Sequence, residues 1–219
     1  MHNSVQKYKD IISAIDKKLE EQKINYTPKV IAVSKTFKLE NILPLIEYGH
    51  LDYGENKVQE AIDKWSAIKL KKQNIKLHLI GKLQTNKVKH ALKIFDYIHS
   101  VDSIKLAKKI ADEQNKQNKI LKLFVQVNIG DEEQKSGIKV DQIEDLISFS
   151  KKLNLNIIGL MCIPPVNEEP DKYFKEIKIL SKKFNLQEIS MGMSSDYLKA
   201  VENSSTYLRI GSSIFGQRF

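Results

Sequence analysis

The hydrophobic positions of this chain form short apolar runs that alternate with longer amphipathic stretches. The clearest run, residues 30–34, contains no charged residue and leads directly into Lys35. A continuous apolar run of this length is typical of a strand that is buried on both faces of a parallel sheet. By contrast, residues 3–22 place their apolar side chains at helical spacing and predict an amphipathic helix ahead of the first strand.

The same two patterns repeat to the end of the chain. Strands are predicted at residues 30–34, 51–54, 77–81, 97–101, 121–127, 157–161, 188–190 and 207–210. Helices are predicted at residues 3–22, 39–48, 55–68, 86–93 (with Thr85 as N-cap), 103–117 (with Ser103 as N-cap), 140–153, 170–184 and 195–203. Strands that alternate with helices form a parallel sheet with crossover helices. Eight such units predict an α/β protein with a single (β/α)8 TIM-type barrel, and an open doubly wound sheet is the alternative.

Composition agrees with one soluble domain over residues 1–219, with residues 1–25 as a leading helix packed on the barrel. The chain has 219 residues, of which 41% are hydrophobic and 29% charged. Its single cysteine excludes an intrachain disulfide. No apolar run approaches the roughly 20 residues of a membrane helix, and the polar N-terminus lacks a signal core. We therefore expect the protein in the cytoplasm.

The formal net charge of +9 favours anionic partners. The lysines are spread along the whole chain without interleaved aromatic residues, which is weak evidence for a nucleic-acid surface. We do not expect nucleic acid binding, and salt-dependent binding of RNA or DNA would revive it. Phosphorylated metabolites are the other class of anionic partner.

In a barrel, the residues that follow each strand meet at one mouth. Here these residues are mostly polar or glycine: Lys35, Glu55, Asn56, Gly81, Lys82, Gln126, Asn128, Ser194, Arg209, Gly211 and Ser212. No His, Asp or Glu cluster has the spacing of metal ligands, so no metal site is expected. We interpret His78, His99 and Cys162 as structural residues.

Two small-residue turns follow the last two strands. Residues 190–195 read Ser-Met-Gly-Met-Ser-Ser, and residues 209–213 read Arg-Ile-Gly-Ser-Ser. Glycine lets backbone N–H groups approach an anion, serine hydroxyls donate hydrogen bonds, and barrel enzymes often bind phosphate after strands seven and eight. Each turn alone is equally consistent with a helix cap or an ordinary turn, but together they favour a phosphate site.

A lysine that faces a phosphate site across a barrel mouth suggests a Schiff base with a phosphorylated aldehyde. The amine is nucleophilic only when it is neutral, so its pKa must be lowered by desolvation or by a nearby cation. Arg209 could supply that cation. Whether Arg209 faces the ring of such a ligand or its phosphate is open, and a solvated Lys35 at the end of a strand is the simpler alternative.

Several motifs together resemble the YggS/PROSC family, the pyridoxal phosphate homeostasis proteins related to the N-terminal barrel of alanine racemase. They span almost the whole chain: Ala32–Thr36, Gly54–Glu60, His78–Lys87, Val127–Ile129, Lys135–Gly137, Gly159–Met161, Met191–Asp196, Arg209–Gly211 and Phe215–Arg218. The resemblance implies a fold-type III barrel that carries pyridoxal 5′-phosphate (PLP) and serves intracellular vitamin B6 balance.

The resemblance also implies roles for individual residues. It implies that Lys35 holds PLP as a Schiff base and that the other cofactor-binding residues are Asn56, Met161, Ser194, Arg209, Gly211 and Ser212. Two positions depart from the family pattern. Ser212 stands where threonine is more frequent and keeps the hydroxyl, and Asn203 stands where glycine is common and tolerates a left-handed backbone.

The sequence is compatible with three functions: a PLP carrier or homeostasis protein, a PLP-dependent racemase-like enzyme acting on amino acids, and a nucleic-acid-binding module. Racemases of this fold add a β-rich domain that supplies a catalytic tyrosine, whereas this chain stops at Phe219, soon after the last strand. We therefore expect a PLP-binding protein without two-base racemisation, although weak activity stays open. Its expected partners are PLP and, as candidate recipients, PLP-dependent apo-enzymes, and we expect a monomer.

Overall fold

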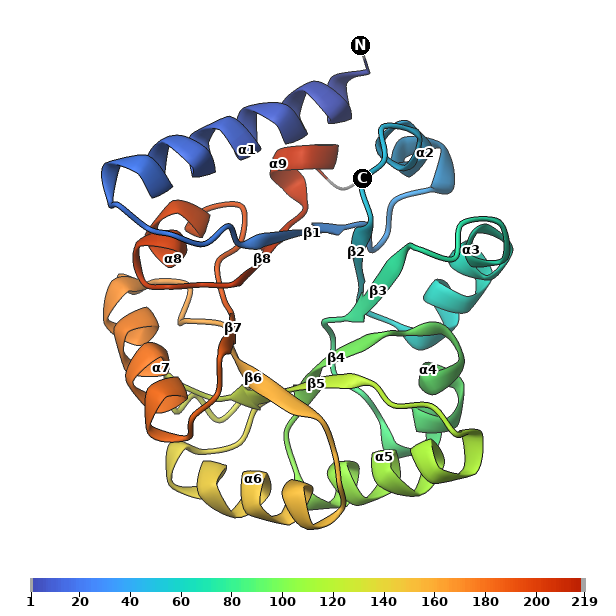
Figure 1. Ribbon diagram of the computed structural model, residues 1–219, viewed down its shortest axis with the longest axis vertical. Helices are drawn as coiled ribbons and strands as arrows, with labels where there is room; N and C mark the ends of the chain where they lie inside the picture. The colour runs from blue at the N-terminus through green and yellow to red at the C-terminus, as the bar shows by residue number, and fades with distance from the viewer. Residues whose placement is uncertain (1, 218–219) are drawn as a thin grey trace.

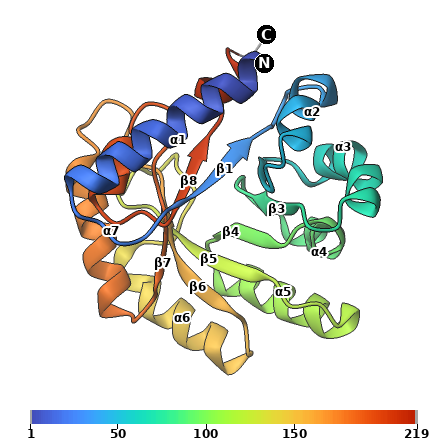
Figure 2. The same ribbon diagram turned by 45° about the horizontal axis from the view of Figure 1, so that its top comes forward.

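In the computed structural model, which describes residues 2–217, eight parallel strands close into a barrel in chain order (Figure 1). The strands are β1 (Lys29–Val33), β2 (Asp52–Glu55), β3 (Lys76–Leu79), β4 (Tyr97–Val101), β5 (Lys122–Val127), β6 (Ile157–Cys162), β7 (Glu188–Ser190) and β8 (Tyr207–Ile210). Figure 2 shows β1 and β8 side by side in the same direction, where pairs such as Ile31 with Arg209 close the sheet. The predicted TIM-type barrel is therefore confirmed.

Helices surround the barrel on its outer side. They are α1 (Asn3–Glu21), α2 (Leu39–Glu47), α3 (Val58–Lys71), η1 (Thr85–Lys87), α4 (Val88–Ile94), α5 (Ile104–Gln117), η2 (Val140–Gln142), α6 (Ile143–Lys152), α7 (Asp171–Lys183), α8 (Tyr197–Glu202) and α9 (Ser212–Phe215). The leading helix α1 packs against α2, α8 and α9, as Figure 1 shows. In the described part of the chain, no helix is long and apolar enough to cross a membrane.

Alternation along the strands separates two buried layers. Outward-facing side chains such as Ala32, Leu77 and Leu160 join the large core beneath the helices. Inward-facing side chains form a smaller cluster inside the barrel: Ile31, Tyr97, Phe124, Met161 and Tyr207. The barrel interior is therefore filled by side chains, and a ligand site has to lie above this layer.

Three local predictions need correction. Thr85 does not cap α4, because a 3₁₀ turn over residues 85–87 precedes that helix, whereas Ser103 does cap α5 through the N–H of Leu106 at 3.3 Å. A short helix, α9, follows β8 where only a turn was expected. The left-handed residue near the end of α8 is Ser204, with φ of 70°, and Asn203 instead donates its side-chain N–H to Asp171.

Two completely buried histidines and one partly buried histidine predict a pH-dependent stability. Burial lowers the pKa values of His50, His78 and His99 below the ordinary value. Near pH 6.5 and below, the unfolded chain therefore binds more protons than the folded chain. The folded state loses stability as the pH falls through and below the unfolded histidine pKa of about 6.5. We expect the free energy of unfolding, measured by urea denaturation, to decrease from pH 7.5 to pH 5, by up to about 1.4 kcal/mol for each pH unit below 6.5 and for each histidine that stays neutral in the folded state. A His99→Gln variant should show a smaller decrease, and an unchanged decrease would contradict this origin.

Candidate functional site

A cavity of about 590 Å³ opens at the carboxyl ends of the strands. Six of the seven predicted site residues line it together: Lys35, Asn56, Ser194, Arg209, Gly211 and Ser212. These residues come from the ends of β1, β2, β7 and β8, which lie far apart in the sequence. Closure of the barrel therefore brings these six residues together, as the order of the strands suggested.

Met161 is the exception, because it does not line the cavity. Its side chain is fully buried in the inner cluster with Phe124 and Tyr207, one layer below the cavity. Side chains on a strand return to the same face every second residue. Ile163, two residues further along, is accordingly the residue of this segment that lines the cavity.

Ser194 lies at the centre of a small anion-binding arrangement. The backbone N–H groups of Gly211 and Ser213 both point at its hydroxyl oxygen, each at 3.3 Å. Two N–H groups that converge on one point can bind an oxygen of an anion, and in this structure the hydroxyl oxygen of Ser194 accepts from both. Ser194 itself belongs to the loop before α8 and does not cap that helix, because the N-cap position is Asp196. These residues therefore fit a phosphate group.

Arg209 forms the buried end of the cavity. Only 4% of its surface is exposed, and its guanidinium donates to the hydroxyl of Ser190 at 2.7 Å and to the carbonyl of Cys162 at 2.8 Å. Burial lowers its pKa. The neighbouring thiol of Cys162 has its pKa raised to about 12 by burial, so the expectation that this cysteine is a small buried residue without thiolate chemistry is consistent with its surroundings.

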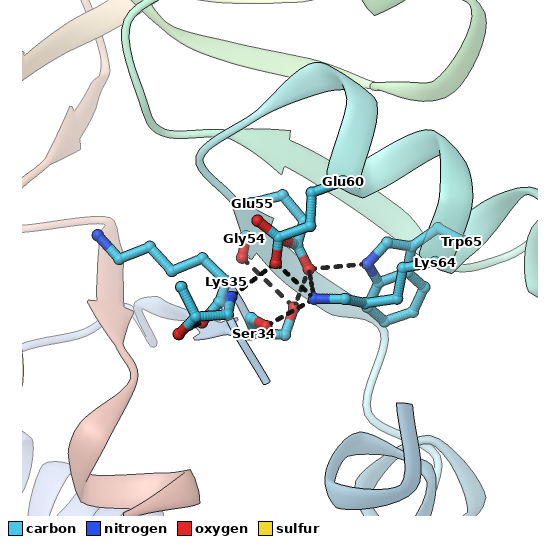
Figure 3. Close-up of polar contacts among 8 residues, drawn as sticks. Ser34, Lys35, Gly54, Glu55, Glu60, Lys64 and Trp65 are labelled. Atoms are coloured by element: carbon cyan, nitrogen blue, oxygen red, sulfur yellow. Dashed lines mark hydrogen bonds and ion pairs between the residues drawn. The ribbon is translucent and has the colours of Figure 1, made fainter. Parts of the chain in front are cut away.

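Glu55 does not face the cavity, contrary to its expected place at the mouth. It points outward from β2 and is completely buried beneath α3, where one carboxylate oxygen accepts three hydrogen bonds (Figure 3). The donors are the hydroxyl of Ser34 at 2.7 Å, the indole of Trp65 at 2.9 Å and the ammonium of Lys64 at 3.0 Å. This cluster connects the residue before Lys35 to α3.

The cluster extends to the residue after Lys35. Lys64 also donates to the carbonyl of Ser34 at 2.9 Å and to Glu60 at 3.0 Å. The same Glu60 oxygen accepts the backbone N–H of Thr36 at 2.6 Å. Thr36 has a φ of 68°, which is unfavourable for a β-branched residue and must be maintained by its surroundings. We call Glu55, Glu60 and Lys64 the turn clamp, because they hold residues 34–36 from behind.

The turn clamp leaves the Lys35 side chain directed elsewhere. Figure 3 shows that side chain extending away from Glu55, Glu60 and Lys64. Lys35 lies at the cavity and is half-buried. The clamp thus fixes the backbone on both sides of Lys35.

The wall opposite Ser194 contains residues that were not assigned a role from the sequence. Lys82, Gln126, Lys135 and Ser136 line the cavity from the ends of β3 and β5. Lys135 donates to the carbonyl of Pro164 at 3.0 Å and forms an ion pair with Glu132, which braces the loop after β5. The long segment between β5 and α6 was the available signal, since loops at this end of a barrel carry function.

Comparison with known proteins agrees with this arrangement. A sequence model of the family described as "Alanine racemase, N-terminal domain" matches residues 12–218. The pyridoxal phosphate homeostasis protein of Aquifex aeolicus is 38% identical over 200 residues, which cover 87% of each chain. This chain belongs to the pyridoxal phosphate homeostasis family. The resemblance expected from the sequence motifs is thereby confirmed, although Arg218, the end of the last motif, lies outside the described residues, as do residues 1 and 219.

Two solved structures place the family in context. PipY of Synechococcus elongatus PCC7942, solved with PLP bound, has a TM-score of 0.79 and 33% identity, and the match covers 92% of this chain and 100% of that chain. An alanine racemase of Clostridium difficile 630 has a TM-score of 0.72 at 14% identity, with 95% of this chain matching 57% of that one. The racemase likeness shows a shared fold, whereas the homeostasis relatives share sequence as well.

Proposed function

We propose that this protein binds PLP reversibly at the barrel mouth and serves intracellular PLP homeostasis. The single observation that carries the proposal is that Lys35 shares one cavity with an oxygen on which two backbone N–H groups converge. A phosphorylated aldehyde needs both an amine and an anion site, and this cavity has both. The relatives named pyridoxal phosphate homeostasis proteins support the same function.

In this proposal each residue has a simple task. Ser194, Gly211 and Ser212 bind the phosphate through hydroxyl and backbone donors. Lys35 would hold the aldehyde group of PLP through its side-chain amine. Arg209, at the buried end of the cavity, and Asn56, in its wall, would orient the ring. When bound to an amine, PLP acts as an electron sink for amino acids, and a cationic Arg209 near its ring nitrogen would weaken that property.

We expect the protein to act in the cytoplasm on free PLP and, by passing it on, on PLP-dependent apo-enzymes. Among the described residues that line the cavity, no tyrosine or histidine offers the second acid–base group of a two-base racemase. This supports a binding role over catalysis.

The proposal is tested by mixing the purified protein with excess PLP, removing free PLP by gel filtration, and measuring retained PLP and amino acid racemisation. We expect about one PLP per chain, a visible absorbance band, and no sustained racemisation of L-alanine. Loss of all PLP on the column would overturn the binding site, and multiple turnovers of racemisation would favour the enzyme instead.

A further inference from the structure

A continuous row of hydrogen bonds crosses the inside of the barrel and ends at Arg209. It begins at Asp52, at the amino end of β2, whose carboxylate lies 2.9 Å from Nε2 of His78. Nδ1 of His78 lies 3.0 Å from Nε2 of His99, and Nδ1 of His99 lies 2.9 Å from the Ser190 hydroxyl. That hydroxyl accepts from Arg209 at 2.7 Å. The row therefore connects the lower end of the barrel to the cavity through β2, β3, β4, β7 and β8.

The chemistry of the two ends gives every hydrogen bond in this row the same direction. Arg209 can only donate, and the ionised Asp52 can only accept, so His78 carries its proton on Nε2. A neutral His78 then accepts on Nδ1, which requires the proton of His99 to be on Nε2. Nδ1 of His99 is left to accept from the hydroxyl of Ser190. Each group thus donates toward Asp52.

Packing holds the two imidazoles in this arrangement. His78 stacks on Tyr97 with ring centroids 4.1 Å apart, and His99 stacks on Phe124 at 4.3 Å. Both histidines are completely buried, and burial lowers the pKa values of both, which favours their neutral forms. The groups that act electrostatically on them are Lys29, Asp52, Asp96 and Arg209.

The row matters because Arg209 is a buried cation. In the described part of the chain, no carboxylate forms a salt bridge with it, and Asp196 acts on it only at longer range. A buried charge is costly unless it is hydrogen-bonded and compensated. Aligned hydrogen bonds polarise one another, so the charge of Asp52 can stabilise the guanidinium through the intervening groups.

We infer that Asp52, His78, His99 and Ser190 form a one-directional hydrogen-bonded chain that positions Arg209 and sets the charge environment of the ring of a bound PLP. The inference rests on the proposed function for its ligand, but the row of hydrogen bonds is present in the protein without ligand. Ser190 and His99 are positioning residues, because they act through Arg209.

The direction of the hydrogen bonds in this row is tested in the PLP-free protein by ¹⁵N NMR of the histidine side chains. We expect His78 and His99 to be neutral at pH 7 and to carry their protons on Nε2. Ser190→Ala should change the signal of His99 Nδ1, whereas Ser190→Thr keeps the hydroxyl and should retain it. A proton on Nδ1 of His99 in the wild type would overturn the inference, whether or not PLP binds.

The effect on the ligand is tested by the absorbance band and the dissociation constant of bound PLP in variants that keep the wild-type circular dichroism. Ser190→Ala and Asp52→Asn should shift the band and weaken binding several-fold, and Ser190→Thr should restore both. Asp63→Asn is the control for loss of a carboxylate, because Asp63 lies on α3, outside the barrel, and accepts from Gln59 and not from the hydrogen-bonded row. Wild-type spectra and affinities in both Ser190→Ala and Asp52→Asn would overturn the inference. A wild type that binds no PLP would instead refute the proposed function.

Discussion

Replacing Ser194 with aspartate is expected to weaken PLP binding by at least about 100-fold, since a carboxylate about 4 Å from a phosphate opposes it by several kcal/mol. The position is critical because the N–H groups of Gly211 and Ser213 converge on the Ser194 oxygen, and the new carboxylate would take those donors. The loss is measured by titrating the protein with PLP and following the visible absorbance of the bound form.

Pyridoxal without its phosphate is the matched control ligand for this experiment. It should bind Ser194→Asp and the wild type with affinities within a few-fold of each other, because no phosphate is present to be repelled. Ser194→Ala should show an intermediate loss for PLP, since it removes one hydroxyl but adds no charge. Equal losses of pyridoxal and PLP in Ser194→Asp would mean that Ser194 is not at the phosphate.

Lys64→Met is expected to lower the free energy of unfolding by about 3–5 kcal/mol, the range for removing one partner of a buried ion pair. Lys64 is the cation of the turn clamp and lies between the carboxylates of Glu55 and Glu60, with its own side chain only 9% exposed. Its loss leaves Glu55 buried without a cation. Urea denaturation measures the stability, and amide hydrogen exchange at Thr36 should become faster because that N–H donates to Glu60.

Two further variants separate the turn clamp from a general charge effect. Lys172→Met removes a lysine from an exposed i,i+4 pair with Glu168 and should change stability by less than about 1 kcal/mol. The double variant Lys64→Met/Glu55→Gln should be more stable than Lys64→Met alone, because the buried carboxylate is gone. A Lys64→Met protein as stable as Lys172→Met, with unchanged exchange at Thr36, would refute the clamp.

Much of the barrel could be predicted because several of its strands are short, mostly apolar runs. The runs at β1, β5 and β6 gave the correct elements, since a strand buried on two sides needs no alternation of polar residues. The strands β4, β7 and β8 were also placed correctly, although they carry His99, Ser190 and Arg209 on the inside of the barrel. Short elements escaped detection. The helix α9 has only four residues, too few for a helical period to appear in the sequence.

The residues that line the cavity could be predicted from their position at the ends of the strands. The direction in which each side chain points could not. Lys35, Ser194 and Arg209 follow or end their strands, and the barrel brings them to one cavity. Met161 and Glu55 also lie near strand ends, but one points into the lower layer of the barrel and the other outward to α3. For Glu55, a shift of one residue reverses the face of the strand; for Met161, a shift of two residues changes the layer inside the barrel. The sequence alone did not determine the register that decides both.

Lys35 is the residue to which we expect PLP to become attached. Lys82 and Lys135 line the same cavity and are the direct competitors. Reduction of the PLP-loaded wild-type protein with borohydride, followed by peptide mass spectrometry, identifies the modified lysine. We predict stoichiometric modification of Lys35 alone and none in Lys35→Ala. Modification of Lys82 or Lys135 in the wild type, with Lys35 unmodified, would contradict the account.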